Sequence, residues 1–312
     1  MKRKSRPLDL QRLSTEKANL ASAELDCMSS LEIVRIINTE DGKIAAAVAR
    51  SLPRIARVID WIAAGLSRGG RLIYVGTGTS GRIAALDAAE CPPTFSTDPE
   101  MVQFVIAGGQ KALAQATEAS EDSRKLGREA MAKKKPRQND VVVGVAASGR
   151  TPFTIAAIEY ARSHGARTVA VVCNPSSPLE KAAHIAIVAA VGPEVVAGST
   201  RMKAGTAQKM ILNMLTTGAM THLGYVYGNL MVNLQLTNKK LAARGITILQ
   251  KAAVLDRAAA QTFLREARDS VPVALVMAKA GVSRVQATAA LRKSHGHVRR
   301  AIATAKSGKK IP

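Results

Sequence analysis

The sequence predicts an α/β fold, a doubly wound and mainly parallel five-stranded sheet with an N-terminal helical arm before it and a small C-terminal helical bundle after it. Two observations predict this fold. Short apolar runs alternate with helical patterns, which is the order of a parallel sheet with helical crossovers. Each apolar run is also nearly continuous, as expected for strands covered on both faces. The expected strands are 71–76 (RLIYVG), 101–107 (MVQFVIA), 140–147 (DVVVGVAA), 167–173 (RTVAVVC) and 185–191 (IAIVAAV).

Helical patterns fill the gaps between these strands and flank them. Apolar residues at helical spacing continue from Asp41 to Leu66 past Pro53, which we expect to kink or split the helix, and Gly69-Gly70 ends it. The other expected helical segments are 13–40 (the arm), 80–91, 110–135, 151–163, 176–183, 205–222 and 225–243, with three or four short helices within 245–306. We therefore expect an arm at 1–60, a main domain at 61–225, a connecting helix at 226–244, and a helical bundle with a basic tail at 245–312.

Composition indicates a cytoplasmic globular protein. The chain has 312 residues, of which 47% are hydrophobic and 3% aromatic, which is enough to bury a full core. It contains no apolar run of the roughly 18–20 residues needed to cross a bilayer, and its opening MKRKSRPLDL lacks the apolar stretch of a signal peptide. The three cysteines are scattered, without CxxC spacing, and we expect them to be reduced thiols.

The net charge of +22 is concentrated in three segments. Residues 1–12, 124–137 and 292–310 hold 19 basic and 2 acidic side chains, and the remaining chain holds 26 and 21. No aromatic residues are interleaved with the basic ones to stack on bases. We therefore interpret the excess as solvated tails and a helix end, and we do not expect specific binding to nucleic acid.

Hydroxyl side chains gather where the expected strands end. The strands run into GTGTSGR, SGRTPFT, NPSSP and GPEVVAGSTRMKAGTAQK, and ligands of open parallel sheets bind at this edge. Helix N-termini with nearby hydroxyls form a site that suits one phosphate group. GTGTSG matches the dinucleotide pattern, but the second strand leads into IAGGQ without the ribose-binding acid, because Glu100 precedes that strand. No GK[ST] follows the glycines either, so these loops predict a monophosphate site.

Two acidic clusters are candidates for proton transfer. LDAAECPP places Asp87 and Glu90 about one helical turn apart, and we expect Pro92-Pro93 to end that helix. ATEASED places three carboxylates on what we expect to be one helix. Spacing alone does not single out one carboxylate of either cluster as the catalytic one. The histidines show no metal-ligand spacing, and no metal site is predicted. The second cluster consists of Glu118, Glu121 and Asp122.

Four stretches of the chain resemble the bacterial N-acetylmuramic acid 6-phosphate etherases, which have a sugar isomerase (SIS) domain. The stretches are RLIYVGTGTSGRIAALDAAECPPTFS, DVVVGVAASGRTPF, VGPEVVAGSTRMKAGTAQKMILNMLTTGAM and VYGNLMVNLQLTNKKL. The resemblance extends from about residue 14 to 300 and implies a SIS fold with a UBA-like C-terminal bundle. It implies cleavage of a D-lactyl ether without a cofactor, in recycling of cell-wall amino sugars, by a homodimer. The animal glucokinase regulatory protein, which binds sugar phosphates, has similar loops.

The resemblance also implies roles for individual residues. The glutamate of the family's ECPP motif corresponds to Glu90, the general acid, and that of its ED pair corresponds to Glu121, the base. A phosphosugar isomerase with a single base, or a sugar-phosphate-binding regulator, is the alternative. The residues expected to bind phosphate and sugar are Thr79, Ser80, Gly81, Ser148, Gly149, Arg150, Thr151, Ser199, Thr200, Arg201 and Lys203.

Overall fold

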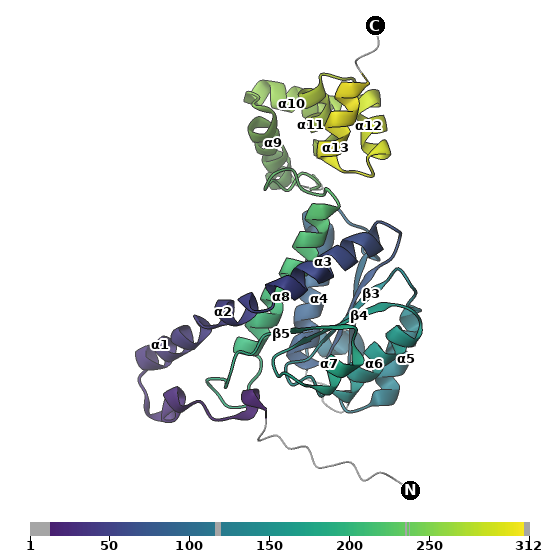
Figure 1. Ribbon diagram of the computed structural model, residues 1–312. Helices are drawn as coiled ribbons and strands as arrows, with labels where there is room; N and C mark the ends of the chain where they lie inside the picture. The colour runs from purple at the N-terminus through teal and green to yellow at the C-terminus, as the bar shows by residue number, and fades with distance from the viewer. Residues whose placement is uncertain (1–12, 116–119, 235, 237, 309–312) are drawn as a thin grey trace. The chain divides into compact units, whose positions relative to one another are not determined.

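The computed structural model describes residues 13–115, 120–234, 236 and 238–308 and contains one five-stranded parallel sheet among them. Its strands lie in the order β2-β1-β3-β4-β5, and every neighbouring pair is parallel. Figure 1 labels β3, β4 and β5 of this sheet. The predicted fold class and all five predicted strands are confirmed. The strands are β1 (Leu72–Gly76), β2 (Val102–Ile106), β3 (Val141–Val145), β4 (Arg167–Val172) and β5 (Ile185–Val188).

Helices cover both faces of the sheet, which explains the continuous apolar runs. On one face, Ile73, Val142 and Ala170 pack with apolar side chains of α5, α6 and α7. Figure 1 shows α3, α4 and α8 on the other side of the sheet. These helices are α3 (Leu52–Leu66), α4 (Gly78–Phe95), α5 (Arg124–Lys134), α6 (Pro152–Ser163), α7 (Pro178–Ala182) and α8 (Lys203–His222).

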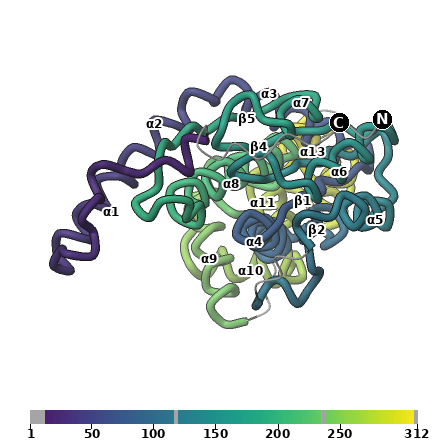
Figure 2. Tube along the Cα trace, turned by 90° about the horizontal axis from the view of Figure 1, so that it is seen from below, coloured from purple at the N-terminus to yellow at the C-terminus, as the bar shows by residue number. Residues whose placement is uncertain are grey.

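The N-terminal arm is less helical than expected. Between Leu13 and Met28 the chain forms three short 3-10 turns, at Ser14–Glu16, Leu20–Ser22 and Leu25–Cys27. A capping box of Ser29 and Glu32 then starts α1 (Ser30–Asp41), which lies away from the sheet in both views (Figures 1 and 2). The predicted break at Pro53 is confirmed, since α2 (Ile44–Ala49) ends before it and Pro53 lies in the first turn of α3.

Three helix predictions were wrong. Instead of one helix over 110–135, a 3-10 turn at Gly109–Leu113 precedes α5, which begins only after Ser123 caps it. Pro92-Pro93 does not end α4, whose last turn closes with a hydrogen bond from Ser96 N to Pro92 O at 2.8 Å.

The third error concerns 225–243, where the helix begins only at Lys239. Gly224 and Gly228 have φ of +84° and +61°. These values lie outside the right-handed helical region, and glycine adopts them readily because it has no Cβ. The segment after Tyr225 contains an antiparallel bridge between Tyr227 and Leu230. The Asn238 side chain accepts from Leu241 N and caps the helix that follows.

The chain divides into two compact units, one of Met1–Ala88 with Glu100–Leu215 and the other of Ala89–Pro99 with Thr216–Pro312. The second unit contains a helical bundle with its own apolar core. No helix of the described residues is long and apolar enough to cross a membrane. The helices of the bundle are α9 (Lys239–Ala253), α10 (Arg257–Glu266), α11 (Val271–Ala280), α12 (Arg284–Lys293) and α13 (Val298–Ser307).

Candidate functional site

The loop between β1 and α4 brings the sheet and the helix into close contact. A Cβ at Gly81 would lie 2.6 Å from the Ile106 side chain, and one at Gly76 would lie 3.0 Å from Gly81 N, so a side chain at either position would crowd its neighbours. The first intrahelical bond of α4 runs from Gly81 N to Thr77 O at 3.0 Å. The N–H groups before it, together with the hydroxyls of Thr79 and the buried Ser80, form the type of helix N-terminus that binds anions.

Glu121 lies directly against this loop. Thr77 Oγ1 donates to Glu121 Oε2 at 2.9 Å, and a Cβ at Gly78 would lie 3.2 Å from Glu121 Oε1. The backbone of Glu121 is fixed as well, since Phe153 N in the first turn of α6 donates to Glu121 O at 3.0 Å. The half-buried Glu121 carboxylate is therefore held at the carboxyl edge of the sheet.

The prediction of one helix carrying all three carboxylates of ATEASED was wrong. Glu121 and Asp122 lie in a turn before α5, and Glu118 lies outside the described residues. The turn, rather than a helix face, directs the Glu121 side chain to the β1–α4 loop.

The loop between β3 and α6 presents a second set of predicted residues. Ser148 Oγ accepts from Arg150 N at 3.2 Å, and Thr151 is the N-cap residue of α6. Gly149 has φ of +66°, and a Cβ there would lie 2.3 Å from Ser177 Oγ, so the loop packs tightly against the segment that follows β4. The buried Nε of Arg150 has no hydrogen-bond partner among the described residues, which leaves a cationic donor for an anion.

The loop between β5 and α8 contains a third set of predicted ligand-binding residues. Glu194, fully buried, accepts from the N–H groups of Lys203 and Ala204 at 2.9 Å each and so caps α8. Burial raises the pKa of Glu194, and these hydrogen bonds oppose the rise. A Cβ at Gly205 would lie 3.5 Å from Thr79 Cγ2 and 3.6 Å from Thr200 O, which places the α8 and α4 N-termini side by side. The half-buried Ser199 and the exposed Arg201 flank Thr200.

Lys203, predicted as an anion ligand, forms a buried ion pair within the protein instead. Its side chain is 1% exposed, and its Nζ forms an ion pair with Glu40 Oε2 at 2.5 Å. Glu40, at the end of α1, also pairs with the more exposed Lys43. Burial alone would raise the pKa of Glu40, but the hydrogen bonds from Lys203 and Lys43 outweigh it and lower the pKa to about 2.

The two carboxylates of LDAAECPP have different surroundings. Asp87 is buried, and its oxygens accept from Tyr74 Oη at 2.8 Å and from Asn213 Nδ2 at 2.7 Å, so it ties β1, α4 and α8 together. Glu90 lies one turn further along α4, in the second unit, and is exposed. Between these two, Glu90 is the side chain available for chemistry.

Sequence reasoning missed four contributors to this edge of the sheet. Thr77 lies within GTGTSGR, but its sequence context gives no sign that it donates to Glu121. Gln208 on α8 is 1% exposed, and its amide has no hydrogen-bond partner among the described residues, although it lies in the stretch GPEVVAGSTRMKAGTAQK that follows the fifth strand. Asn174 and Thr15 join the N-terminal segment to the loops, a contact between residues 159 apart that no local pattern signals.

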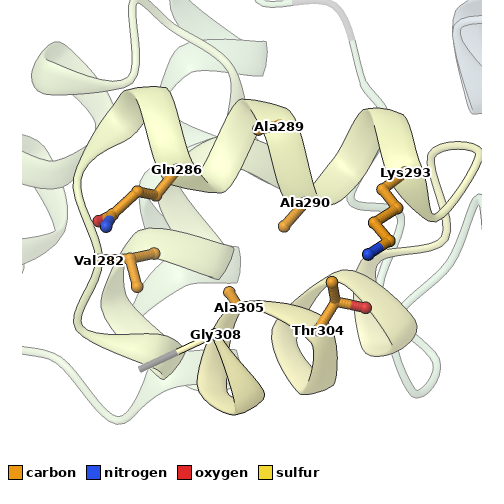
Figure 3. Close-up of a pocket in the computed structure, with 8 residues that line it drawn as sticks. All are labelled: Val282, Gln286, Ala289, Ala290, Lys293, Thr304, Ala305 and Gly308. Carbon is orange, nitrogen blue, oxygen red and sulfur yellow. The ribbon is translucent and has the colours of Figure 1, made fainter. Parts of the chain in front are cut away.

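The described residues contain no group of three or more His, Cys, Asp or Glu side chains that could hold a metal ion. Cys173 is buried, which, with the nearby Glu194 charge, raises the pKa of its thiol to about 12. A separate pocket of about 280 Å³ lies between α12 and α13 (Figure 3). Its lining includes Val282, Ala290 and Lys293 but no carboxylate or imidazole, so Lys293 is its one ionisable side chain and has no acid or base partner in the pocket.

This arrangement of hydroxyl-rich loops at the carboxyl edge of a five-stranded parallel sheet defines a SIS-domain protein. The SIS domain model matches residues 129–218, and the model of the glucokinase regulatory protein N-terminal SIS domain matches residues 54–162. A solved phosphoheptose isomerase from Francisella tularensis is 16% identical, with a TM-score of 0.49 over 62% of this chain and 100% of that one.

Relatives at higher identity define the family more narrowly. The N-acetylmuramic acid 6-phosphate etherase of Aeromonas hydrophila is 49% identical over 93% of this chain and 98% of its own. That of Symbiobacterium thermophilum is 54% identical over 88% of this chain and 91% of its own. The chain belongs to the N-acetylmuramic acid 6-phosphate etherase family.

Proposed function

We propose that this protein cleaves the D-lactyl ether of N-acetylmuramic acid 6-phosphate to give N-acetylglucosamine 6-phosphate and D-lactate, as a cytoplasmic step in recycling of cell-wall amino sugars. The observation that carries the proposal is the placement of Glu121 against the anion-binding loop, within a chain of this family. A phosphate held at the loop brings the rest of a phosphosugar toward that carboxylate.

Glu121 acts as the base in the first step. In the open-chain sugar, the C2 proton lies next to the C1 aldehyde and is acidic enough for a positioned carboxylate to remove. The hydrogen bond from Thr77 and the backbone bond from Phe153 hold the Glu121 carboxylate in one orientation. Such positioning reduces the entropy cost of proton transfer.

Glu90 acts as the acid. The electron pair from the C2–H bond forms a C2–C3 double bond as the C3–O bond breaks, and Glu90 protonates the departing lactate oxygen. Water then adds to C3 of the unsaturated aldehyde, and a proton returns to C2, which gives N-acetylglucosamine 6-phosphate. An exposed carboxyl group such as Glu90 can take up a proton again from solvent after each turnover.

Three loops bind the substrate. The α4 N-terminus with Thr79, Ser80 and Gly81 holds the phosphate, and Arg150 supplies a cation through its unpaired Nε. Its neighbours Ser148, Gly149 and Thr151, with Ser199, Thr200 and Arg201 across the site, contact the sugar and the lactyl carboxylate. We assign Lys203 to the Glu40 ion pair instead.

We further propose a homodimer in which Glu90 acts on the substrate bound to the partner subunit. Glu90 follows Ser80 by ten residues on α4, about 15 Å along the helix axis. Only three carbon–carbon bonds separate C6, which carries the phosphate, from C3, which carries lactate. A substrate whose phosphate is held at Ser80 therefore ends short of the Glu90 of the same chain.

Release of D-lactate from N-acetylmuramic acid 6-phosphate tests the activity. An isomerase would interconvert sugar phosphates without releasing lactate, and a regulator would bind the substrate unchanged. Absence of lactate from folded protein would refute the etherase proposal.

Subunit mixing tests the shared site. Glu90→Gln and Glu121→Gln are each expected to be inactive alone, and equal amounts of the two, unfolded and refolded together, should regain about a quarter of wild-type activity, because half of the dimers are mixed and each has one intact site. If both glutamates of a site came from one chain, the mixture would stay inactive.

A further inference from the structure

The N-terminal segment Ser14–Glu16 contacts three loops of the site, two of them through the buried side chain of Asn174 and the third through the Thr15 backbone. Asn174 lies two residues after β4 and is 2% exposed. Its Oδ1 accepts from both Ser14 N and Ser14 Oγ at 2.9 Å, and its Nδ2 donates to Thr15 Oγ1 at 3.0 Å and to Ala147 O at 3.1 Å. The Asn174 amide thereby uses its full hydrogen-bonding capacity.

Two backbone groups that this segment and Asn174 contact belong to residues next to proposed ligand-binding residues. Ala147 O, which Asn174 fixes, immediately precedes Ser148. Thr15 O accepts from Gly198 N at 3.2 Å, and Gly198 immediately precedes Ser199. Gly198 has φ of +76°, and a Cβ there would lie 3.0 Å from Glu16 Oε2, so the Glu16 side chain lies against the same turn.

We infer that the segment Ser14–Glu16 positions the substrate-binding loops, with Thr15 and Asn174 as its positioning residues, an inference that rests on the function proposed above. The fully buried Thr15 connects to the β3–α6 loop through Asn174 and to the β5–α8 loop through its own backbone. Loss of the Thr15 hydroxyl leaves a buried amide donor of Asn174 without one partner, and the two loops can then shift relative to each other. Phosphosugar affinity depends on that relative placement.

A matched pair of substitutions separates positioning from stability. Thr15→Val removes a fully buried hydroxyl at the carboxyl edge of the sheet. Thr168→Val removes another fully buried hydroxyl, which hydrogen-bonds His184 Nδ1 at 2.7 Å near the amino end of β4, the opposite edge. Thr15→Ser retains the hydroxyl. Full-length variants are compared by urea unfolding, by kcat and KM for D-lactate release, and by calorimetric binding of N-acetylglucosamine 6-phosphate.

Thr15→Val is expected to raise KM and the Kd of N-acetylglucosamine 6-phosphate about tenfold, with a smaller change in kcat, and Thr15→Ser to restore both. Thr168→Val should lose comparable stability and keep the wild-type KM and Kd. Wild-type Kd in Thr15→Val, or an equal rise in Thr168→Val, would overturn the inference.

Two further measurements keep the outcomes separable. If Thr15→Val does not fold, Ser14→Ala removes a single hydrogen bond to Asn174 from a half-buried residue. A rise in the Kd of N-acetylglucosamine 6-phosphate in Ser14→Ala would then support the inference, and an unchanged Kd would overturn it. If wild-type protein releases no lactate, the proposed function fails, and binding of N-acetylglucosamine 6-phosphate and of inorganic phosphate still tests the positioning role without turnover.

Discussion

The buried ion pair between Lys203 and Glu40 makes a prediction that separates a structural lysine from a ligand-binding one. The Lys203→Met substitution removes the ammonium group and leaves Glu40, 4% exposed, with Lys43 as its remaining cationic partner. Removal of one member of a buried pair costs about 3–5 kcal/mol of folding free energy. Because Lys43 still neutralises part of the charge, we expect the lower end, about 3 kcal/mol.

Urea unfolding at pH 7 measures this loss as a lower midpoint with an unchanged slope. The double variant Glu40→Leu with Lys203→Met removes both charges and should recover much of the loss, because no buried charge is left unpaired. Inorganic phosphate should bind all folded variants with wild-type affinity. If Lys203→Met were as stable as wild type and bound phosphate more weakly, the structural role would be refuted. Lys203 would then be assigned to phosphate binding.

Three other predictions concern acid stability, packing and thiol chemistry. The Glu40 carboxylate has a pKa of about 2 instead of 4.5, so the stability that it contributes is present above about pH 4.5 and is lost as the pH falls toward 2. Acid unfolding followed by circular dichroism should therefore show a smaller loss of folding stability over this range in Glu40→Gln than in wild type. Gly127→Ala should lower the free energy of unfolding by about 1–3 kcal/mol in urea, since its Cβ would lie 2.1 Å from Phe153 O; a variant as stable as wild type would contradict this contact. A thiol reagent should label the exposed Cys27 in native protein but not Cys173, whose burial raises its pKa to about 12, and rapid labelling of Cys173 would contradict its burial.

The sheet was predictable from the sequence because its signal is local. Five apolar runs, each ended by a cluster of small or polar residues, correspond to β1–β5, and a parallel sheet brings their carboxyl ends to one edge. The loop residues of that edge were therefore predictable as a group. Their hydrogen-bond partners, such as Thr77 for Glu121, were not.

The errors arose where distant contacts decide the structure. The turn at Glu121 is held by Phe153, 32 residues away, so helical spacing around it carried no information about its real position. Lys203 appeared as a free cation because its partner Glu40 lies 163 residues earlier in the chain. Likewise Asp87 and Glu90 look equivalent in the sequence, and only the contacts of Asp87 with Tyr74 and Asn213 distinguish them.

Isotope labelling of the reaction tests the central claim, elimination started by Glu121, most directly. Purified protein converts N-acetylmuramic acid 6-phosphate in D₂O, or in H₂¹⁸O, and mass spectrometry follows both products. We predict D-lactate without ¹⁸O in its hydroxyl group, and N-acetylglucosamine 6-phosphate with deuterium at C2 and ¹⁸O at C3, with no conversion by Glu121→Gln. Retention of hydrogen at C2, ¹⁸O in the lactate hydroxyl group, or normal turnover of Glu121→Gln would contradict the account.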